Sequence, residues 1–165
     1  MRMGFTLLEL VVVMAILAVI SAAITPVYVF AMDGIRMRNA QRDIIALIRY
    51  AQEEAVRESR EHRVYFNKDT GAYRLMRLAG LEDDEKVFEI AASLFDDEEV
   101  LPQPLVFGSI DARRDRSTRE YFVSCLPNGA SDKAEIQLRD ERSRGSYVKI
   151  IVEGPLGKIT LEEPR

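Results

Sequence analysis

The stretch Gly4-Phe5-Thr6-Leu7-Leu8-Glu9-Leu10 opens the longest apolar run of the sequence, which continues to Met32. Between Phe5 and Met32 the only charged side chain is Glu9. About 20 consecutive apolar residues are enough to span a bilayer as a helix, and this run is longer. The sequence therefore predicts a membrane-spanning helix over residues 5–32.

Glu9 is out of place in such a helix. A carboxylate at the centre of a bilayer costs about 2.5 to 3.5 kcal/mol, and somewhat less toward the interface. No Lys or Arg stands three or four residues away from it. We therefore expect Glu9 to have a partner elsewhere, such as on another molecule; the alternative is a glutamate that reaches the membrane interface and has no partner.

The composition is that of one anchor and one small globular domain. The chain has 165 residues, 47% of them apolar and 30% charged. A net charge of −4 and a pI near 5.2 argue against a general nucleic-acid-binding surface. The single cysteine, Cys125, excludes an intrachain disulfide and a multi-cysteine zinc site, and we expect it to be a half-buried strand residue.

A secretory signal peptide is the simplest alternative for the N-terminus. Ser21-Ala22-Ala23 has the small residues of a cleavage site. However, the apolar run continues past it to Phe30, and the small residue Gly4 lies before the run. These two features favour processing ahead of the apolar segment, with the segment retained.

The motif Gly4-Phe5-Thr6-Leu7-Leu8-Glu9 resembles the recognition site of type IV prepilins and type II secretion pseudopilins. The resemblance implies that residues 1–4 are a leader and that a prepilin peptidase, which is also the methyltransferase, cuts between Gly4 and Phe5 and methylates the Phe5 amine. It also implies that Glu9 meets the Phe5 amine of a neighbouring subunit in a filament. A desolvated carboxylate and ammonium attract each other far more strongly than in water, so the pair would set the register between subunits.

Pro26 resembles the proline found in the first helix of many pilins. Proline removes a backbone hydrogen bond and tends to kink a helix. We expect a bend at Pro26 within a continuous helix, and Gly34 adds a second weak point.

The pattern after the anchor predicts an amphipathic helix over about residues 35–59. Apolar residues recur there at spacings of three and four, while the other face is charged. We expect the apolar stripe to pack against a sheet. The stripe comprises Met37, Ala40, Ile44, Leu47, Ile48, Ala51 and Ala55, and the charged face Arg36, Arg38, Arg42, Asp43, Arg49, Glu53, Glu54 and Arg57.

Beyond residue 60 the period changes to two, which indicates strands separated by turns. The sequence predicts an α+β fold: a long N-terminal helix, membrane-spanning in its first half and amphipathic in its second, packed on a small, mainly antiparallel β domain. Residues 80–86, 96–99 and 111–119 are expected to be charged loops. The expected strands are 63–66, 72–78, 87–90, 105–107, 121–126, 134–140, 146–153 and 158–161.

The order of elements is similar to that of the GspH/FimT type of minor pseudopilin. The similarity rests on a helix ending in residues 51–57, a hairpin, a turn at Leu101-Pro102 and the stretch 122–129. It implies a single-pass protein of the bacterial inner membrane, with residues 33–165 forming a pilin-like domain in the periplasm. The implied partners are the prepilin peptidase, other pseudopilins in a filament, the inner-membrane assembly platform and the lipid bilayer.

The sequence departs from the major pseudopilins, which share a C-terminal calcium-binding loop. Here the tail Glu162-Glu163-Pro164-Arg165 follows a predicted strand directly. The acidic cluster Glu82-Asp83-Asp84-Glu85 lacks the alternating ligand spacing of calcium loops, so we expect a solvated loop there. This disfavours a main shaft subunit, and no metal site is predicted.

No catalytic constellation is apparent in the sequence. His62 stands among charged residues, which predicts a surface position, and pairing it with Cys125 would lack a third group to orient the base. No Gly-rich phosphate loop is present. We therefore predict that the protein is not an enzyme and needs no cofactor.

The segment from 111 to 119 is the best nucleic-acid candidate. Its four arginines could contact phosphates, as in FimT-like minor pilins that bind DNA. Acidic residues lie among them and no aromatic residue interleaves, so a solvated loop or a subunit-contact loop is the alternative. The arginines are Arg113, Arg114, Arg116 and Arg119.

The function that these patterns favour is a minor pseudopilin of a type II secretion system, which assembles through its N-terminal helix and helps drive protein export across the outer membrane. The alternative is a FimT-like minor pilin of a type IV pilus with a role in DNA binding and uptake. A third reading is a membrane-anchored domain that never polymerises.

Overall fold

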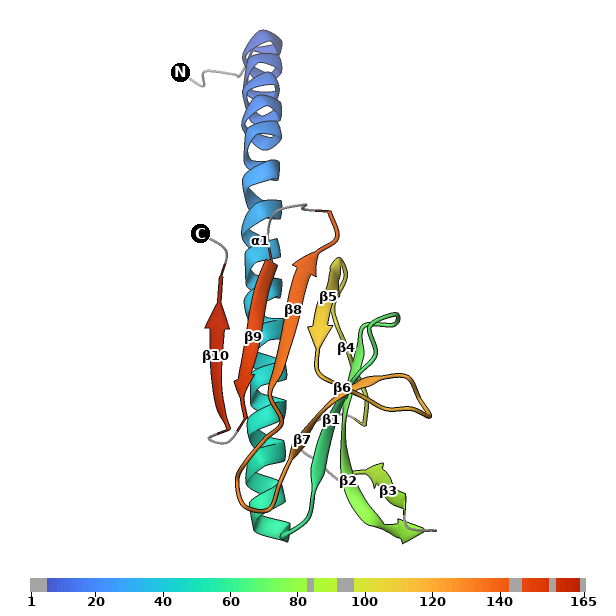
Figure 1. Cartoon of the computed structure of the whole chain (residues 1–165). Coiled ribbons are helices and arrows are strands. Elements are labelled where there is room, and N and C mark those ends of the chain that lie inside the picture. Colours follow the sequence, from blue (N-terminus) through green and yellow to red (C-terminus); the bar gives the residue numbers. More distant parts are fainter. Residues whose placement is uncertain (1–5, 83–84, 92–96, 143–146, 155–156, 164–165) are drawn as a thin grey trace. The chain divides into compact units, whose positions relative to one another are not determined.

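The computed structural model of the chain describes residues 6–82, 85–91, 97–142, 147–154 and 157–163, without the side chains of 23–33. Helix α1 precedes strands β1 to β10 (Figure 1). The elements are α1 (Leu7–Glu58), β1 (His62–Phe66), β2 (Ala72–Glu82), β3 (Glu85–Ile90), β4 (Glu99–Val100), β5 (Leu105–Asp111), β6 (Arg113–Arg114), β7 (Tyr121–Cys125), β8 (Ala134–Asp140), β9 (Tyr147–Glu153) and β10 (Lys158–Glu162).

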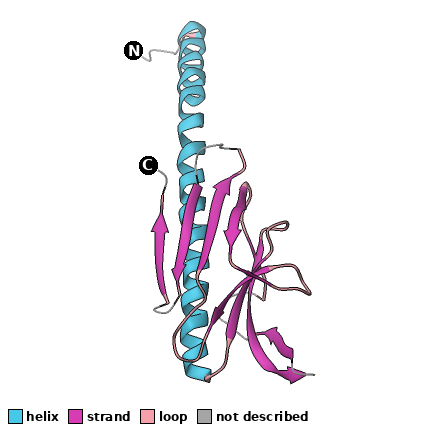
Figure 2. Cartoon of the chain, viewed as in Figure 1, coloured by secondary structure: helices cyan, strands magenta, loops and turns pink. Residues whose placement is uncertain are grey.

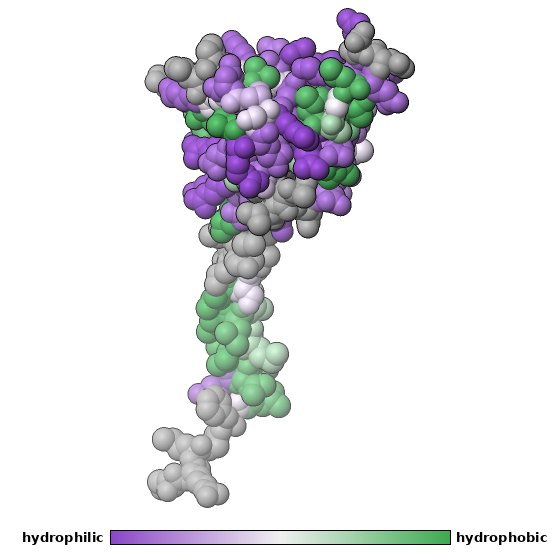
Figure 3. Space-filling model, turned by 90° about the horizontal axis from the view of Figure 1, so that it is seen from below, coloured by the Kyte–Doolittle hydropathy of each residue, from purple (hydrophilic) through white to green (hydrophobic). Residues whose placement is uncertain are grey.

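The chain forms two compact units, Met1–Arg36 and Met37–Arg165. In the first unit, residues 6–22 are exposed, and their surface is largely apolar (Figure 3). Over the residues that the structure describes, no helix combines the length and the apolarity needed to cross a membrane. A membrane span over 5–32 stays a prediction.

In the second unit, α1 buries the stripe predicted from its periodicity. All seven apolar stripe residues, from Met37 to Ala55, are buried, and Ile44, Ile48, Ala51 and Ala55 are fully so. Arg38, Arg42 and Arg49 are exposed, as expected. Glu54 is the exception: it was predicted on the charged face, but it is buried and bonds the Arg57 guanidinium one turn later.

The strands form two antiparallel sheets, which confirms the α+β prediction (Figure 2). The six-stranded sheet has the order β3-β2-β1-β7-β6, with β4 also paired to β2, and the four-stranded sheet has the order β10-β9-β8-β5. The chain passes from the second sheet to the first between β5 and β6, at Ala112.

One hydrophobic cluster joins α1 to both sheets. Ile44 and Leu47 of the helix pack with Phe66 of the six-stranded sheet and Ile136 of the four-stranded sheet in this cluster. Aromatic edge-to-face contact continues it, with Phe66 and Phe107 ring centroids 5.7 Å apart. The second unit therefore has a core of its own.

The tight turn between β1 and β2 follows from its sequence. The Asn67 side-chain oxygen accepts hydrogen bonds from the backbone N–H groups of Asp69 and Thr70, at 3.0 and 3.1 Å. Gly71 closes the turn with a φ of 74°, a conformation that glycine adopts without steric cost. The predicted hairpin is thus confirmed.

Three predicted loops are partly wrong. Strand β2 continues to Glu82 and β3 starts at Glu85, so hairpin pairing extends into the predicted acidic loop 80–86. Pairing between β5 and β8 extends β5 to Asp111 and β6 pairs with β7, inside the predicted loop 111–119. Glu99 likewise begins β4 within 96–99. Charged residues were read as loops because their side chains point to solvent from edge positions, where backbone pairing does not require apolar residues. Asp83, Asp84, Asp96, Ser146, Pro164 and Arg165 lie outside the described residues.

Candidate functional site

The start of α1 is organised by Thr6. The Glu9 backbone N–H donates a hydrogen bond to the Thr6 hydroxyl at 3.2 Å, and the Leu10 N–H donates to the Thr6 carbonyl at 3.2 Å. Thr6 is therefore the N-cap residue, and Glu9 is the third residue of the helix. The sequence signal for this role, Thr-x-x-Glu ahead of an apolar run, was present but was not used in the prediction.

Glu9 lies in the first turn of α1 and is exposed. A carboxylate there is favoured by the partial positive charge of the helix N-terminus. Among the residues that the structure describes, none forms an ion pair with Glu9. Its carboxylate is thus available to a partner from outside the chain. Gly4 and Phe5, predicted for cleavage and methylation, lie outside the described residues.

The side chains beside Glu9 are large, apolar and exposed. Leu7 and Leu8 are 82% and 74% exposed, and Leu17 is 57% exposed. A helix that exposes apolar residues around its circumference needs an apolar environment on every side. Pro26 falls within the bounds of α1, and the predicted bend there stays a prediction.

The arginine-rich segment is a short loop between β6 and β7, from Asp115 to Glu120. Its ends are closed by backbone hydrogen bonds from the Asp115 N–H to the Glu120 carbonyl and from the Arg119 N–H to the Asp115 carbonyl, at 2.9 and 3.1 Å. Arg119 has a φ of 62°, which turns the chain back into β7. The loop thus has a defined conformation.

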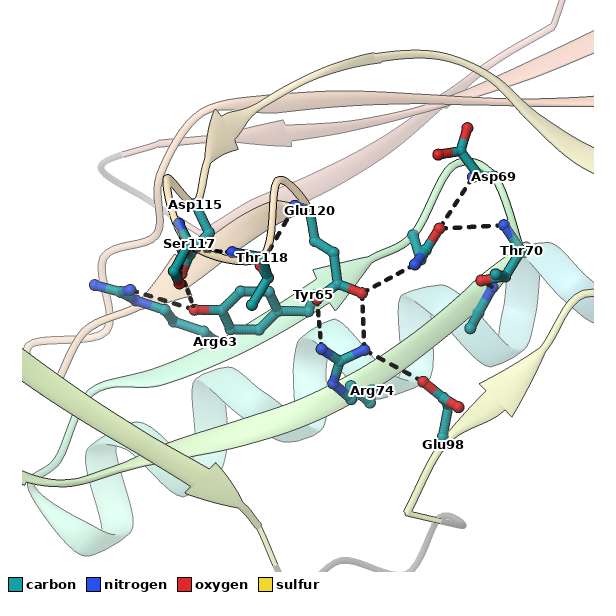
Figure 4. Close-up of polar contacts among 12 residues, drawn as sticks. Arg63, Tyr65, Asp69, Thr70, Arg74, Glu98, Asp115, Ser117, Thr118 and Glu120 are labelled. Atoms are coloured by element: carbon teal, nitrogen blue, oxygen red, sulfur yellow. Dashed lines mark hydrogen bonds and ion pairs between the residues drawn. The ribbon is translucent and has the colours of Figure 1, made fainter.

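Asp115 fastens the first end of this loop to the six-stranded sheet (Figure 4). One carboxylate oxygen accepts hydrogen bonds from the Ser117 backbone and hydroxyl at 2.8 and 2.7 Å, and the other accepts one from the Tyr65 hydroxyl at 2.9 Å. Partial burial alone would raise the pKa of Asp115, but hydrogen bonds from Ser117, Tyr65 and Thr118 outweigh it and lower the pKa to about 2.

Glu120 fastens the other end. Its carboxylate is paired with the Arg74 guanidinium and accepts a hydrogen bond from the Asn67 amide at 3.2 Å. Arg74 also reaches Glu98 at 3.2 Å (Figure 4). Hydrogen bonding to Glu120 is the main cause that raises the pKa of Arg74. The loop is held at both ends by charged contacts with β1 and β2.

The structure separates the four predicted arginines into two pairs. Arg113 reaches Asp132 at 3.4 Å and lies over the Phe122 ring, and Arg114 donates to the Arg119 carbonyl at 2.8 Å. The guanidinium groups of Arg116 and Arg119 are exposed and pair with no described residue. Of the four side chains, only those of Arg116 and Arg119 make no hydrogen bond or ion pair with a described residue.

Sequence reasoning missed Arg63, which lies on β1 of the same six-stranded sheet. The Arg63 guanidinium lies between the Phe88 and Phe122 rings, 3.9 and 4.3 Å from their centroids. It also donates to Glu61 at 2.8 Å, and Glu61 is paired with Lys86. Burial would raise the pKa of Glu61, but its bonds to Lys86 and Arg63 lower it. No short-range sequence signal identifies this arrangement, because its parts come from β1, β3 and β7.

His62 and Cys125 lie opposite each other on β1 and β7, and both are buried. The surface position predicted for His62 is wrong: the ring is 1% exposed, and Nε2 lies 3.6 Å from Glu58. Burial raises the pKa of the Cys125 thiol to about 12, and its Sγ lies 4.0 Å from the Ser131 hydroxyl. A buried, protonated thiol cannot act as a nucleophile on an external substrate.

The described residues contain no group of three or more side chains suited to hold a metal ion. A hollow of about 320 Å³ lies where β5 leaves the four-stranded sheet, and its charged lining residues are Asp111, Arg113, Lys133 and Glu135. Two acids and two bases there balance each other, so the hollow favours no ligand charge.

Comparison with known proteins finds matches for the start of the chain and for its fold. Residues 4–25 match the prokaryotic N-terminal methylation motif. No curated protein is similar to the chain. The minor pseudopilin EpsH from the type 2 secretion system of Vibrio cholerae is similar in structure, with a TM-score of 0.61 and 11% identity over 78% of this chain and 98% of that chain.

The type IV minor pilin FimU of Pseudomonas aeruginosa is also similar in structure. Two crystal forms give TM-scores of 0.52 and 0.53, at 17% and 16% identity, over 78% and 81% of this chain and 97% and 96% of FimU. Structural similarity at identities this low establishes the fold alone. The chain thus carries a prokaryotic N-terminal methylation motif on the fold that minor pseudopilins and type IV minor pilins share.

Proposed function

We propose that the protein is a minor pseudopilin of a type II secretion system, anchored in the bacterial inner membrane by residues 5–32 with its β-rich domain in the periplasm. The observation that carries the proposal is a helix start that exposes Glu9 and large apolar side chains within a methylation motif, ahead of a domain with its own core. The likeness to EpsH supports the fold part of this assignment.

The mechanism of such a subunit is polymerisation. The prepilin peptidase removes residues 1–4 and methylates the new amine of Phe5. Subunits then leave the bilayer through the assembly platform, and their apolar helices pack together in the filament. Glu9 neutralises the Phe5 amine of a neighbour; a buried pair costs little when complete and a great deal when one partner is missing, so only correct registers are stable.

The Glu9→Ala variant tests this mechanism. We expect membrane insertion and the unfolding midpoint of the domain to remain as in the wild type, while incorporation into sheared filaments is lost. Leu10→Ala is the matched control, because it removes a neighbouring exposed side chain without removing charge. Wild-type incorporation of Glu9→Ala would contradict the registry role. Retention of Met1 in the mass spectrum of a Gly4→Ala variant would independently show that processing requires Gly4.

The alternative is a FimT-like minor pilin that captures DNA. The observation that favours it is the anchored loop, which presents Arg116 and Arg119 without described internal partners. Titration of duplex DNA at two salt concentrations should then show salt-sensitive binding by the full chain in detergent that weakens in an Arg116→Ala, Arg119→Ala double variant. Arg139→Ala, an exposed arginine on β8, is the control. Absence of binding at low salt would exclude this alternative.

A further inference from the structure

The segment that follows the apolar run is strongly basic. Residues 34–42 contain Arg36, Arg38 and Arg42 and no acidic residue, although the whole chain carries a net charge of −4. Ahead of the apolar run, Arg2 is the one basic side chain. Positive charge is therefore concentrated on the C-terminal side of the predicted membrane span.

Membrane orientation does not explain this distribution. Lysine and arginine next to a span favour the cytoplasmic side of the membrane. The proposed function places residues 33–165 in the periplasm, where this bias predicts few arginines, but a domain of that length is translocated largely regardless of its charge. The arginines that follow Met32 therefore require another explanation.

In the second unit, three arginines lie along one side of α1. Spacings of four and seven residues place Arg38, Arg42 and Arg49 on the same side of a helix with 3.6 residues per turn. All three are exposed, and none of them pairs with another residue that the structure describes. A guanidinium group has five N–H donors, so these side chains can bind an anion from outside the chain.

Arg38 is the nearest of the three to the predicted span. It follows Met32 by six residues, which corresponds to a rise of about 9 Å along a helix. The side chains of a helix lean toward its N-terminus, which for α1 is the direction of the span. The headgroup layer extends about 5 to 7 Å beyond the hydrocarbon core. The Arg38 guanidinium can therefore reach lipid phosphates.

Arg42 and Arg49 lie about 6 and about 16.5 Å farther along α1 than Arg38, at 1.5 Å per residue. Electrostatic attraction in solution is screened over about 8 Å at physiological ionic strength. Arg42 lies within that distance of the level of Arg38, whereas Arg49 lies about two such distances beyond it. A charged membrane surface should therefore attract Arg38 and Arg42 but not Arg49, although all three share one side of the helix.

We propose that Arg38 and Arg42 bind the headgroups of anionic phospholipids in the membrane that holds the anchor. A guanidinium can donate two parallel hydrogen bonds to one phosphate, which a lysine ammonium cannot match. Each basic residue near an anionic bilayer surface strengthens binding about fivefold. The inference rests on the proposed function, because it requires residues 5–32 to lie in the bilayer. The contact holds the start of the second unit at the membrane surface and breaks when the subunit leaves for the filament.

Native mass spectrometry of the full chain in a neutral detergent tests the contact. Anionic phosphatidylglycerol and zwitterionic phosphatidylcholine are titrated separately, and the apparent Kd of the first bound lipid is measured for each. We expect phosphatidylglycerol to bind at least about tenfold more tightly. Arg38→Gln with Arg42→Gln should weaken phosphatidylglycerol binding at least about tenfold and leave phosphatidylcholine binding unchanged.

Two further double variants are the controls. Arg49→Gln with Arg60→Gln removes the same charge from exposed positions farther along the chain, and its affinity for phosphatidylglycerol should stay within about twofold of the wild type. Arg38→Lys with Arg42→Lys keeps the charge but not the paired hydrogen bonds. Its affinity should lie between those of the wild type and the Arg38→Gln, Arg42→Gln variant.

Three outcomes would overturn the proposal. The first is equal affinity of the wild type for the two lipids. The second is an equal loss in the two glutamine double variants, which would show a response to total charge instead of a site. The third is a loss of filament incorporation in Arg38→Gln, Arg42→Gln with unchanged lipid affinity, which would assign the arginines to an acidic surface of a neighbouring subunit.

These outcomes are separable from those of the proposed function. Equal binding of the two lipids by a chain whose Glu9→Ala variant loses filament incorporation would remove the lipid contact and leave the pseudopilin role standing. A preference for phosphatidylglycerol in a chain whose Glu9→Ala variant assembles normally would keep the lipid contact and remove the registry role of Glu9.

Discussion

The two halves of α1 share one helical backbone and differ in where their apolar side chains point. Residues 7–20 expose leucine, valine and isoleucine side chains on all sides, whereas residues 37–55 collect theirs in one buried stripe. A stripe can be covered by the sheets of the same chain, but a helix that is apolar all round can be covered only by lipid or by other helices. The difference separates a segment that packs in the core of the domain from one whose apolar surface the described chain leaves uncovered.

The largest loss of stability should come from a substitution in the core that the second half of α1 covers. Phe66→Ala in β1 removes a fully buried ring, and we expect it to lower the free energy of unfolding by about 3 to 5 kcal/mol. Leu17→Ala in the first half should change it by less than about 0.5 kcal/mol. Urea unfolding of the full chain in detergent, followed by circular dichroism, measures both. Similar losses in the two variants would show that the first half also stabilises the domain.

A smaller loss of stability is expected when Arg63, which is held between two aromatic rings, is replaced. Arg63→Ala removes the contacts with Phe88 and Phe122 and one hydrogen bond to buried Glu61, for an expected cost of about 2 kcal/mol. The same urea experiment measures it. Arg139→Ala, on an exposed site of β8, is the control and should be neutral. If the two arginine variants were equally stable, the stacked arrangement would not contribute to stability.

In the first half of α1, a substitution that weakens the helix should affect only the residues near it. Thr6→Ala removes the hydroxyl that accepts the Glu9 N–H and should cost about 1 kcal/mol of helix stability at the N-terminus. Hydrogen exchange at the Glu9 amide should accelerate about fivefold, while Thr6→Ser should retain the wild-type rate. The unfolding midpoint of the second unit should not change, and a shift in it would contradict the independence of the two halves.

A pH-dependent effect should appear in acid, at the loop held by Asp115. Its pKa in the folded protein is about 2, below the ordinary 3.8, so the carboxylate stabilises the fold above that ordinary value. This contribution should decline as the pH falls from about 5 to about 2. The difference in melting temperature between the wild type and Asp115→Asn should therefore shrink over this range. A constant difference would show that charge on Asp115 does not matter.

The periodicity of apolar residues was sufficient to predict the elements that bury one face. The stripe from Met37 to Ala55 and strand β8 are as predicted, because burial on one side imposes a regular apolar pattern. It failed at sheet edges: β6 and the first two residues of β3, Glu85 and Lys86, are charged, since an edge strand needs only backbone partners. His62 was misplaced for a related reason, because its charged neighbours on the chain do not reveal that its own side chain faces the core.

The sequence by itself determined the two kinds of helix surface, the methylation motif with its isolated Glu9, and the α+β class, because each depends on residues close together along the chain. Only the tertiary structure decided that two sheets share one core, that Arg63 is held between rings from β3 and β7, and that Arg113 and Arg114 are engaged while Arg116 and Arg119 are presented. These depend on contacts between distant residues, which local pattern does not encode. Glu9 has no ion-pair partner among the described residues, and we propose that a neighbouring molecule supplies one.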